Sequence, residues 1–367
     1  MVIEKFMPGK RAIIVVIITC IFIPLIIYCP QLIYILYPKQ MHTMPDTVGT
    51  GSYDEQLGIA TPEEVGIDNI VLFGVDNRTP NDSARTDSII IATFDKSSKV
   101  IKLTSIMRDL YVPIGSTKSM ERINTAYTIG GPELTLRTLN KNFGLDLKYY
   151  AVIDFTAFQY LVDKLGGIDV EIKAYEVKEI NYYIKNANWS NPLFIKGSGF
   201  QHLNGQQALS FARIRKVGNG DWERIQRQRL VLKCLVEKVK QTNITKAPEL
   251  LTTLVSYIHT NISLSKIISL GIAAYRFNNN IESIRIPVDG YCEDQYVNGA
   301  SVLVPDIGAN ALFLKRFIYD MKAPTNKDVP TYMQNNFHVD DNSSTWLKPK
   351  PNIPNYSTPD IPFIEEE

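Results

Sequence analysis

The amino-acid sequence predicts an α/β (α+β) fold in which helices flank a central mixed β-sheet, as a single extracellular domain behind one N-terminal transmembrane helix. Short apolar runs bounded by turn residues, typical of buried strands, predict the sheet. Segments of helical periodicity alternate with these runs and predict the flanking helices. A long uncharged stretch near the N-terminus predicts the membrane anchor. We therefore expect one domain over residues 69–320, where no internal repeat is evident.

The anchor is predicted at residues 12–37, which contain no charged side chain, whereas a helix needs about 20 residues to cross a bilayer. The preceding Lys5, Lys10 and Arg11 place residues 1–11 in the cytoplasm by the positive-inside rule. A cleaved signal peptide is the alternative, but the apolar run is too long for one and lacks small residues at a cleavage site. We expect a single-pass protein of the cell membrane with the bulk of the chain extracellular.

Composition and cysteine usage narrow the function classes. Residues 38–68 predict a stalk, and residues 321–367, rich in Pro and Asn, predict a flexible tail. The 39 Lys and Arg residues balance 38 Asp and Glu residues, so no global basic field favours nucleic acid. Only Cys234 and Cys292 lie outside the anchor, which excludes a disulfide scaffold but leaves one bridge between them open. The sequence contains no zinc-ligand spacing, Walker loop or nucleophile elbow.

The first strands of the sheet are predicted to carry charged residues to one rim. An apolar strand at 69–75 ends at a polar break, and a hairpin follows, with strands at 89–94 and 100–106. Because the hairpin returns to the edge from which it starts, four charged residues meet there in this arrangement: Asp76, Arg85, Asp87 and Arg108.

Beyond the hairpin, helices and strands alternate. We expect a helix from Gly131-Pro132 to Asn142, a strand at 149–155, a helix at 156–165, a strand at 168–172, a polar excursion at 175–200, and two apolar helices around a strand at 281–287.

A cluster of cations follows the short helix predicted from residue 203. Arg213 and Arg215 alternate with apolar neighbours, so an extended backbone would point both the same way. A Gly-Asn-Gly turn then leads to a helix that runs to about Lys240, with Asp221 as its expected N-cap. Three residues on one flank of that helix complete the cluster: Arg224, Arg227 and Gln228.

Together the rim and the cation cluster predict a metal-assisted phosphate site. Guanidinium groups are always charged, and their donor geometry suits phosphate oxygens. Mg²⁺ prefers oxygen ligands and usually takes one or two carboxylates plus substrate phosphates. Asp76 and Asp87 could provide those carboxylates. Two simpler alternatives stay open: the arginines form a solvated basic face, or Asp87 pairs with Arg85 or Arg108 and does nothing else.

Several segments, in this order, resemble the LytR-CpsA-Psr proteins of bacterial envelopes. They are GVDNR at 74–78, ARTDSI at 84–89, SIMRDLYV at 105–112, RINTAY at 122–127, FQYLVDKLGGIDVEI at 158–172, LNGQQALSFARIRK at 203–216 and GDWERIQRQR at 220–229. The resemblance covers roughly residues 69–240 and extends weakly to 320. One departure is Met107, where a proline usually precedes the arginine.

The resemblance implies a phosphotransferase that moves an anionic glycopolymer, of teichoic acid or capsule type, from an undecaprenyl-pyrophosphate carrier to peptidoglycan. It implies that Asp76 and Asp87 bind an Mg²⁺ cofactor and are catalytic together with Arg108. It implies a pyrophosphate site made of Arg85, Arg108, Arg213, Arg215 and Gln228, with Arg224 and Arg227 adjacent. An apolar channel for the polyprenyl chain would adjoin it. Two other functions stay open: a polyprenyl-pyrophosphate-binding regulatory protein, and a lipid pyrophosphatase with water as acceptor.

Overall fold

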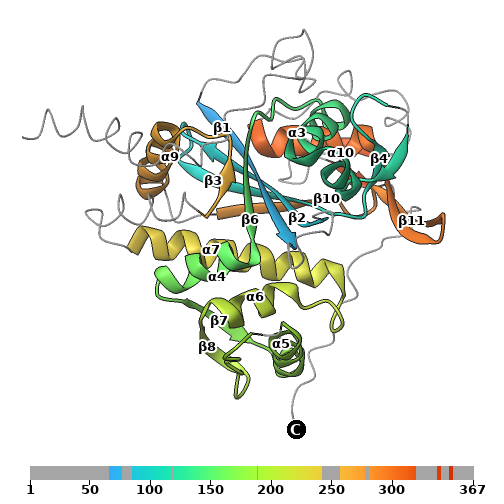
Figure 1. The fold of residues 1–367 in the computed structure, drawn as a ribbon. Helices are drawn as coiled ribbons and strands as arrows, with labels where there is room; N and C mark the ends of the chain where they lie inside the picture. The colour runs from blue at the N-terminus through green and yellow to red at the C-terminus, as the bar shows by residue number, and fades with distance from the viewer. Residues whose placement is uncertain are drawn as a thin grey trace, which may run out of the picture.

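The structure is a computed structural model that describes residues 66–76, 85–117, 119–187, 189–241, 257–277, 281–319, 337–339 and 347–349. A six-stranded mixed sheet lies at its centre, with helices over both of its faces (Figure 1). The predicted α/β architecture, a central mixed sheet flanked by helices, is therefore confirmed.

Several predicted segments lie outside the described residues: the cytoplasmic residues 1–11, the anchor at 12–37, most of the stalk at 38–68 and most of the tail at 321–367. Within the tail the structure describes a pair of short antiparallel strands, β13 (Phe337–Val339) and β14 (Leu347–Pro349). In the described part of the chain, no helix is both long and apolar enough to cross a bilayer.

The strand order of the sheet brings several strand ends to one edge. In that order the strands are β10 (Ile281–Ile286), β3 (Val100–Ile106), β2 (Arg85–Asp95), β1 (Ile67–Asp76), β6 (Tyr149–Asp154) and β9 (His259–Thr260). β2 is antiparallel to both β1 and β3, whereas β1 pairs with β6, and β3 with β10, in parallel. The C-terminal ends of β1, β3, β6 and β10 therefore lie at the same edge as the beginning of β2. The strands predicted at this sheet are confirmed to within a few residues of their expected ends.

Helices cover both faces of the sheet, which explains its continuous apolar runs. One face carries α3 (Asn124–Phe143) and α10 (Ile307–Tyr319), and the other carries α4 (Phe155–Lys164), α7 (Asp221–Gln241) and α9 (Leu264–Arg276) (Figure 1). On β1, Phe73 and Val75 are buried in the core that includes α3 and α10. The alternating Ile70 and Leu72 pack instead on the opposite face, among residues of α7 and α9.

A second hydrophobic core lies on the side of α7 that faces away from the sheet. It is built from α4, β7 (Ile168–Ile172), α5 (Ala174–Asn186), β8 (Gly199–Leu203) and α6 (Gly205–Arg213), which Figure 1 shows below α7. Val231 of α7 is buried in this core, whereas Leu232 also contacts the core under the sheet. α7 is thus a shared layer between the sheet and the smaller subdomain.

The structure contains three features that the sequence analysis did not predict. Residues 175–200 include the helix α5, which buries Ile180 and Ile184 on a narrow stripe among tyrosines and charged residues. A helix begins at Gly131-Pro132 as predicted, because Gly130 and Gly131 leave helical geometry and divide α3 in two, but the helical segment before them, from Asn124, was not expected. The hairpin of β11 (Cys292–Val297) and β12 (Ala300–Pro305) was not expected. Cys234 and Cys292 are both free, so no bridge joins them.

Candidate functional site

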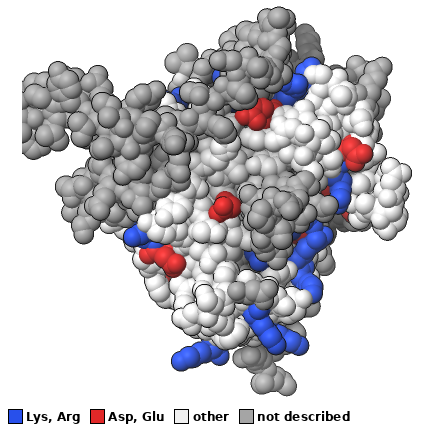
Figure 2. Space-filling view, viewed as in Figure 1, with Lys and Arg blue, Asp and Glu red and all other residues white. Residues whose placement is uncertain are grey.

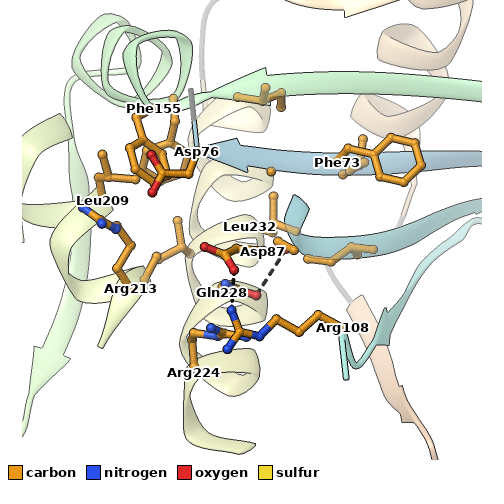
Figure 3. Close-up of a pocket in the computed structure, with 18 of the residues that line it drawn as sticks. Phe73, Asp76, Asp87, Arg108, Phe155, Leu209, Arg213, Arg224, Gln228 and Leu232 are labelled. Carbon is orange, nitrogen blue, oxygen red and sulfur yellow. Dashed lines mark hydrogen bonds and ion pairs between the residues drawn. The ribbon is translucent and has the colours of Figure 1, made fainter. Parts of the chain in front are cut away.

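A pocket opens at the edge of the sheet where β1 and β2 meet α6 and α7 (Figure 3). It holds about 1130 Å³ of space, including its open mouth. On the face of the molecule drawn in Figure 2, Lys and Arg side chains gather down the right-hand side, where Figure 1 draws the end of α7 that follows α6. The predicted site residues that line the pocket are Asp76, Asp87, Arg108, Arg213, Arg215, Arg224 and Gln228.

A β-bulge places Asp87 in this pocket. In the register of the two strands, Gly74 pairs with Ser88 and Val75 with Thr86, so Asp87 is the extra residue on β2. Strict alternation would turn Asp87 to the face of Ile89, which is buried with α3 and α10. Because of the bulge, Asp87 and Ser88 both line the pocket on the α7 side.

Asp87 forms an ion pair with Arg108. The Arg108 Nη1 atom lies 2.5 Å from Asp87 Oδ1, which spans the ends of β2 and β3 (Figure 3). Next to this pair, Ser88 Oγ donates a hydrogen bond of 3.2 Å to Gln228 Oε1 and orients the Gln228 side chain on α7. One of the simpler alternatives, a pairing of Asp87 with Arg108, is therefore present in the structure. The side chain of Asp87 is nevertheless 41% exposed, so it is accessible from the pocket.

Asp221 links three of the pocket arginines and was missed as a site residue. Its Oδ2 atom lies 2.9 Å from Arg215 Nη2 and 3.7 Å from Arg108 Nη2, and its Oδ1 atom lies 3.0 Å from Arg224 Nη2. We expected Asp221 to be the N-cap of the helix, but it is the first residue of α7. Its spacing from Arg224, three residues within the first helical turn, is the signal that predicts an ion pair.

Burial and neighbouring charges shift the pKa values of the two largely buried arginines of this cluster in opposite directions. Burial alone would lower the pKa of Arg108, but Asp109, Asp87 and Asp221 outweigh it and raise the pKa. Burial lowers the pKa of Arg224, and the positive charge of Arg108 lowers it further, with partial compensation from Asp221 and Asp87. The Nε atom of Arg224 is buried and has no hydrogen-bond partner among the described residues. The cluster therefore retains positive charge and donor capacity for an anion.

Arg213 is oriented by aromatic rings. Its guanidinium carbon lies 4.4 Å from the centre of the Phe155 ring and 5.1 Å from that of Tyr183. An aromatic face attracts a cation without carrying a formal charge that would neutralise it. The prediction of an extended backbone at Arg213 is wrong, because this residue is the last of α6, but it does line the pocket together with Arg215.

Arg227, which we expected beside the pyrophosphate contacts, lies outside the pocket lining. Its Nη1 atom lies 2.9 Å from both Glu176 Oε1 and Glu223 Oε2, and its Nη2 atom donates a 3.0 Å hydrogen bond to the Ile214 carbonyl. It is 5% exposed. Because Ile214 separates Arg213 from Arg215, Arg227 holds the segment that carries both.

The turn after Arg215 requires glycine for the same network. Gly218 has φ of +66°, and a Cβ atom there would lie 2.2 Å from Glu223 Oε2.

For Arg85, the structure describes the backbone, which begins β2 opposite Asp76.

The inner part of the pocket is apolar. Leu72 and Ile90 from the sheet, Phe155 and Phe158 from α4, Leu209 from α6, and Val231 and Leu232 from α7 line it. The pocket thus combines charged groups with an apolar lining, an arrangement that suits an amphiphilic anion.

The carboxylates of Asp76 and Asp87 fit the donor chemistry of Mg²⁺, which accepts one or two carboxylates when substrate phosphates complete its shell. Both line the pocket, Asp76 from the Phe155 side and Asp87 from the Arg108 side (Figure 3). Among the described residues, no group of three or more His, Cys, Asp or Glu forms an all-protein metal cage. A metal held here would therefore depend on oxygen ligands from the substrate.

The fold and the pocket define a class of protein: an α/β domain whose pocket suits an amphiphilic anion. The sequence matches the model of the LytR_cpsA_psr family over residues 40–316, and the chain belongs to this family. It is 32% identical over 255 residues to the regulatory protein MsrR of Staphylococcus aureus (strain COL), covering 68% of this chain and 74% of that one. It is 31% identical over 255 residues to the polyisoprenyl-teichoic acid–peptidoglycan teichoic acid transferase TagU of Bacillus cereus, covering 69% of this chain and 77% of that one.

Solved structures share the fold. The crystal structure of B. subtilis TagV aligns with a TM-score of 0.57 at 26% identity, over 70% of this chain and 98% of that one. The family protein YwtF (TagT) with bound octaprenyl pyrophosphate lipid aligns with a TM-score of 0.54 at 24% identity, over 71% of this chain and 94% of that one. The similarity to YwtF (TagT) shows that the two proteins share a fold.

Proposed function

We propose that this protein is a phosphotransferase that moves an anionic glycopolymer from a polyprenyl-pyrophosphate carrier to peptidoglycan. The observation that carries the proposal is a pocket whose lining combines arginines and carboxylates with apolar side chains. A pyrophosphate bound at the mouth would place its polyprenyl chain against the apolar lining and its polymer outside. The transferase name of the relative TagU supports this assignment.

In the proposed reaction, a hydroxyl oxygen of peptidoglycan attacks the phosphorus that bears the polymer. A phosphodiester forms, the bond to the bridging oxygen breaks, and polyprenyl phosphate leaves. Arg108, Arg213 and Arg224 would bind the phosphate oxygens and stabilise the charge that develops on the leaving group. Asp76 and Asp87 would hold Mg²⁺, which supplies further charge neutralisation when bound. The pocket carboxylates are also the groups able to accept the hydroxyl proton.

A regulatory role is the second candidate, because the relative MsrR is named a regulatory protein. A protein that only binds a lipid pyrophosphate needs the arginines and the apolar lining but no metal. The presence of two carboxylates in the pocket, Asp76 and Asp87, therefore favours the transferase.

We also propose that residues 12–37 anchor the protein in the cell membrane, where its lipid-linked substrate resides. Protease added to intact protoplasts is then expected to digest the domain beyond Tyr37. Complete protection of the domain would contradict both this topology and the substrate assignment.

The decisive experiment is a transfer assay with the full-length protein in detergent or nanodiscs. The protein is incubated with Mg²⁺, a lipid-pyrophosphate-linked glycopolymer and peptidoglycan oligomers. We expect polymer covalently attached to peptidoglycan and an equal amount of polyprenyl phosphate. Release of polymer phosphate without attachment would identify a pyrophosphatase. Tight binding without either product would favour the regulatory role.

A further inference from the structure

A second pair of arginines lies beside the pocket, between α7 and the edge strand β10. Arg285 of β10 stacks on Trp222 of α7, with its guanidinium carbon 3.2 Å from the ring centre. The Arg285 Nη2 atom lies 2.5 Å from Oδ1 of Asp289, and its Nε donates a 3.3 Å hydrogen bond to the Pro287 carbonyl. The ring and these contacts fix the plane of the guanidinium, and the Arg285 side chain keeps 14% of its surface exposed.

Arg229, the other member of the pair, has no compensating carboxylate. Its Nη1 atom donates a 3.2 Å hydrogen bond to Ser283 Oγ, and no carboxylate among the described residues lies within 4.0 Å of it. Its Nε atom is buried and has no hydrogen-bond partner in the described part of the chain. Burial lowers the pKa of Arg229, and the neighbouring charge of Arg285 lowers it further. Of the two arginines, Arg285 pairs with the exposed carboxylate of Asp289, whereas Arg229 retains its uncompensated charge and unmet donor capacity.

This arginine pair is continuous with the pocket mouth. Trp222 follows Asp221, which contacts Arg108, Arg215 and Arg224. The backbone makes the same connection, because Met107 N donates a 2.8 Å hydrogen bond to the Ile286 carbonyl, so the residues before Arg108 and after Arg285 are bonded.

We propose that Arg229, Arg285 and Trp222 form a second anion site, which binds a phosphate group of the glycopolymer beyond its pyrophosphate linkage. The site rests on the proposed function and adds a subsite for the polymer itself. Because the lipid chain would occupy the apolar interior, the polymer leaves through the charged mouth and meets the arginine pair next. Guanidinium groups in fixed planes suit phosphate oxygens.

The test compares binding of three probes to the full-length protein by titration calorimetry: farnesyl pyrophosphate, a lipid-free poly(glycerol phosphate) oligomer and inorganic phosphate. In Arg229→Gln/Arg285→Gln we expect the Kd of the oligomer to rise about 100-fold, since each of the two lost charge-assisted contacts to phosphate contributes about tenfold. The Kd of farnesyl pyrophosphate stays unchanged. Arg276→Gln, an exposed arginine at the end of α9, is the matched control and leaves both affinities unchanged.

A second variant guards against a folding defect. Ser283 is exposed and contacts Arg229, so Ser283→Asp places a carboxylate of the protein itself beside Arg229. This carboxylate competes with the phosphate of the oligomer, so oligomer binding weakens although no cation is removed. Unchanged oligomer affinity in both variants, or an equal loss for farnesyl pyrophosphate, overturns the second site. Inorganic phosphate that binds as tightly as the oligomer also overturns the polymer assignment. Failure of the unmodified protein to bind farnesyl pyrophosphate contradicts the proposed function instead.

Discussion

Asp221 and Arg224 form an ion pair within the first turn of α7, with Asp221 Oδ1 3.0 Å from Arg224 Nη2. Both side chains are largely buried, and the other carboxylate oxygen approaches Arg215 and Arg108. One carboxylate therefore holds three arginines from three segments in a common orientation. We regard Asp221 as a positioning residue that substitutes for part of the ligand charge when no anion is bound.

Asp221→Asn is expected to lower the free energy of unfolding by about 3 kcal/mol, because removal of one partner leaves a buried charge uncompensated. An anionic ligand replaces the missing charge, so farnesyl pyrophosphate is expected to raise the Tm of this variant more than that of the unmodified protein. Differential scanning calorimetry measures both effects. Asp169→Asn weakens the more exposed contacts with Lys238 and His202 and serves as the control, with a loss below about 1 kcal/mol. Equal ligand-induced shifts would rule out the positioning role.

Arg213→Lys keeps the charge but removes the planar group that stacks on Phe155 and Tyr183. We expect the rate of glycopolymer transfer to fall about 100- to 1000-fold, as when one oriented donor is removed from a site that stabilises developing charge. The Tm should stay within a few degrees of that of the unmodified protein. Transfer assays on Arg213→Lys and on Arg276→Lys, at an exposed position, make the comparison. Equal rates in the two variants would mean that the cluster is only a solvated basic surface.

The central sheet was predictable because its strands are buried on both faces and so read as apolar runs. Phe73 and Leu72 pack on opposite sides of β1 in separate cores, and both belong to the same run. α5 was not predictable in the same way, because its apolar stripe consists of Val177, Ile180 and Ile184, and tyrosine, asparagine and charged residues cover most of the rest of the helix. A stripe that narrow resembles the polar composition of a loop.

The site was predictable as a set of residues but not in its geometry. The meeting of Asp76, Asp87 and Arg108 follows from strand directions, which the apolar pattern indicates. The bulge that turns Asp87 toward α7 depends on the pairing of β1 with β2, which no local pattern reveals. Arg227 lies on the predicted helix, but its long-range partner Glu176 comes from the unpredicted α5, so its burial could not be foreseen.

Stability in acid is expected to depend on Asp68, a buried residue of β1 that pairs with Lys96 and Lys266. Burial raises the pKa of this carboxyl, but the two lysines outweigh burial and hold the pKa below its usual value. A lowered pKa in the folded state stabilises the fold above the unfolded pKa of about 4, and this stability is lost as the pH falls through the folded value. Asp68→Asn should therefore lower the free energy of unfolding by about 3 kcal/mol at pH 7. Urea titrations from pH 7 to pH 3 should show the difference shrinking below about pH 4, and a constant difference would contradict this account.

The proposed metal site gives the most specific prediction for the pocket carboxylates. Asp76→Asn and Asp87→Asn each remove a negative oxygen from the pocket without changing side-chain size. If the carboxylates hold Mg²⁺ against substrate phosphates, each variant should lose transfer by at least about 100-fold and need more Mg²⁺ for its remaining activity. Chelator should abolish transfer by the unmodified protein, and added Mg²⁺ should restore it.

Asp87 also pairs with Arg108, so loss of activity in Asp87→Asn alone does not identify a metal ligand. The Mg²⁺ titration separates the two roles. An ion-pairing role predicts that Asp87→Asn lowers the maximal rate at an unchanged half-saturating Mg²⁺ concentration. A ligand role raises that concentration about tenfold or more, since loss of even an outer-shell partner of a metal ligand costs about that much affinity. Arg108→Lys is the comparison, because it disturbs the same pair from the other side and should leave the Mg²⁺ requirement unchanged. Normal turnover by Asp87→Asn would exclude the metal role, and the pairing with Arg108 would then be the whole function of this carboxylate.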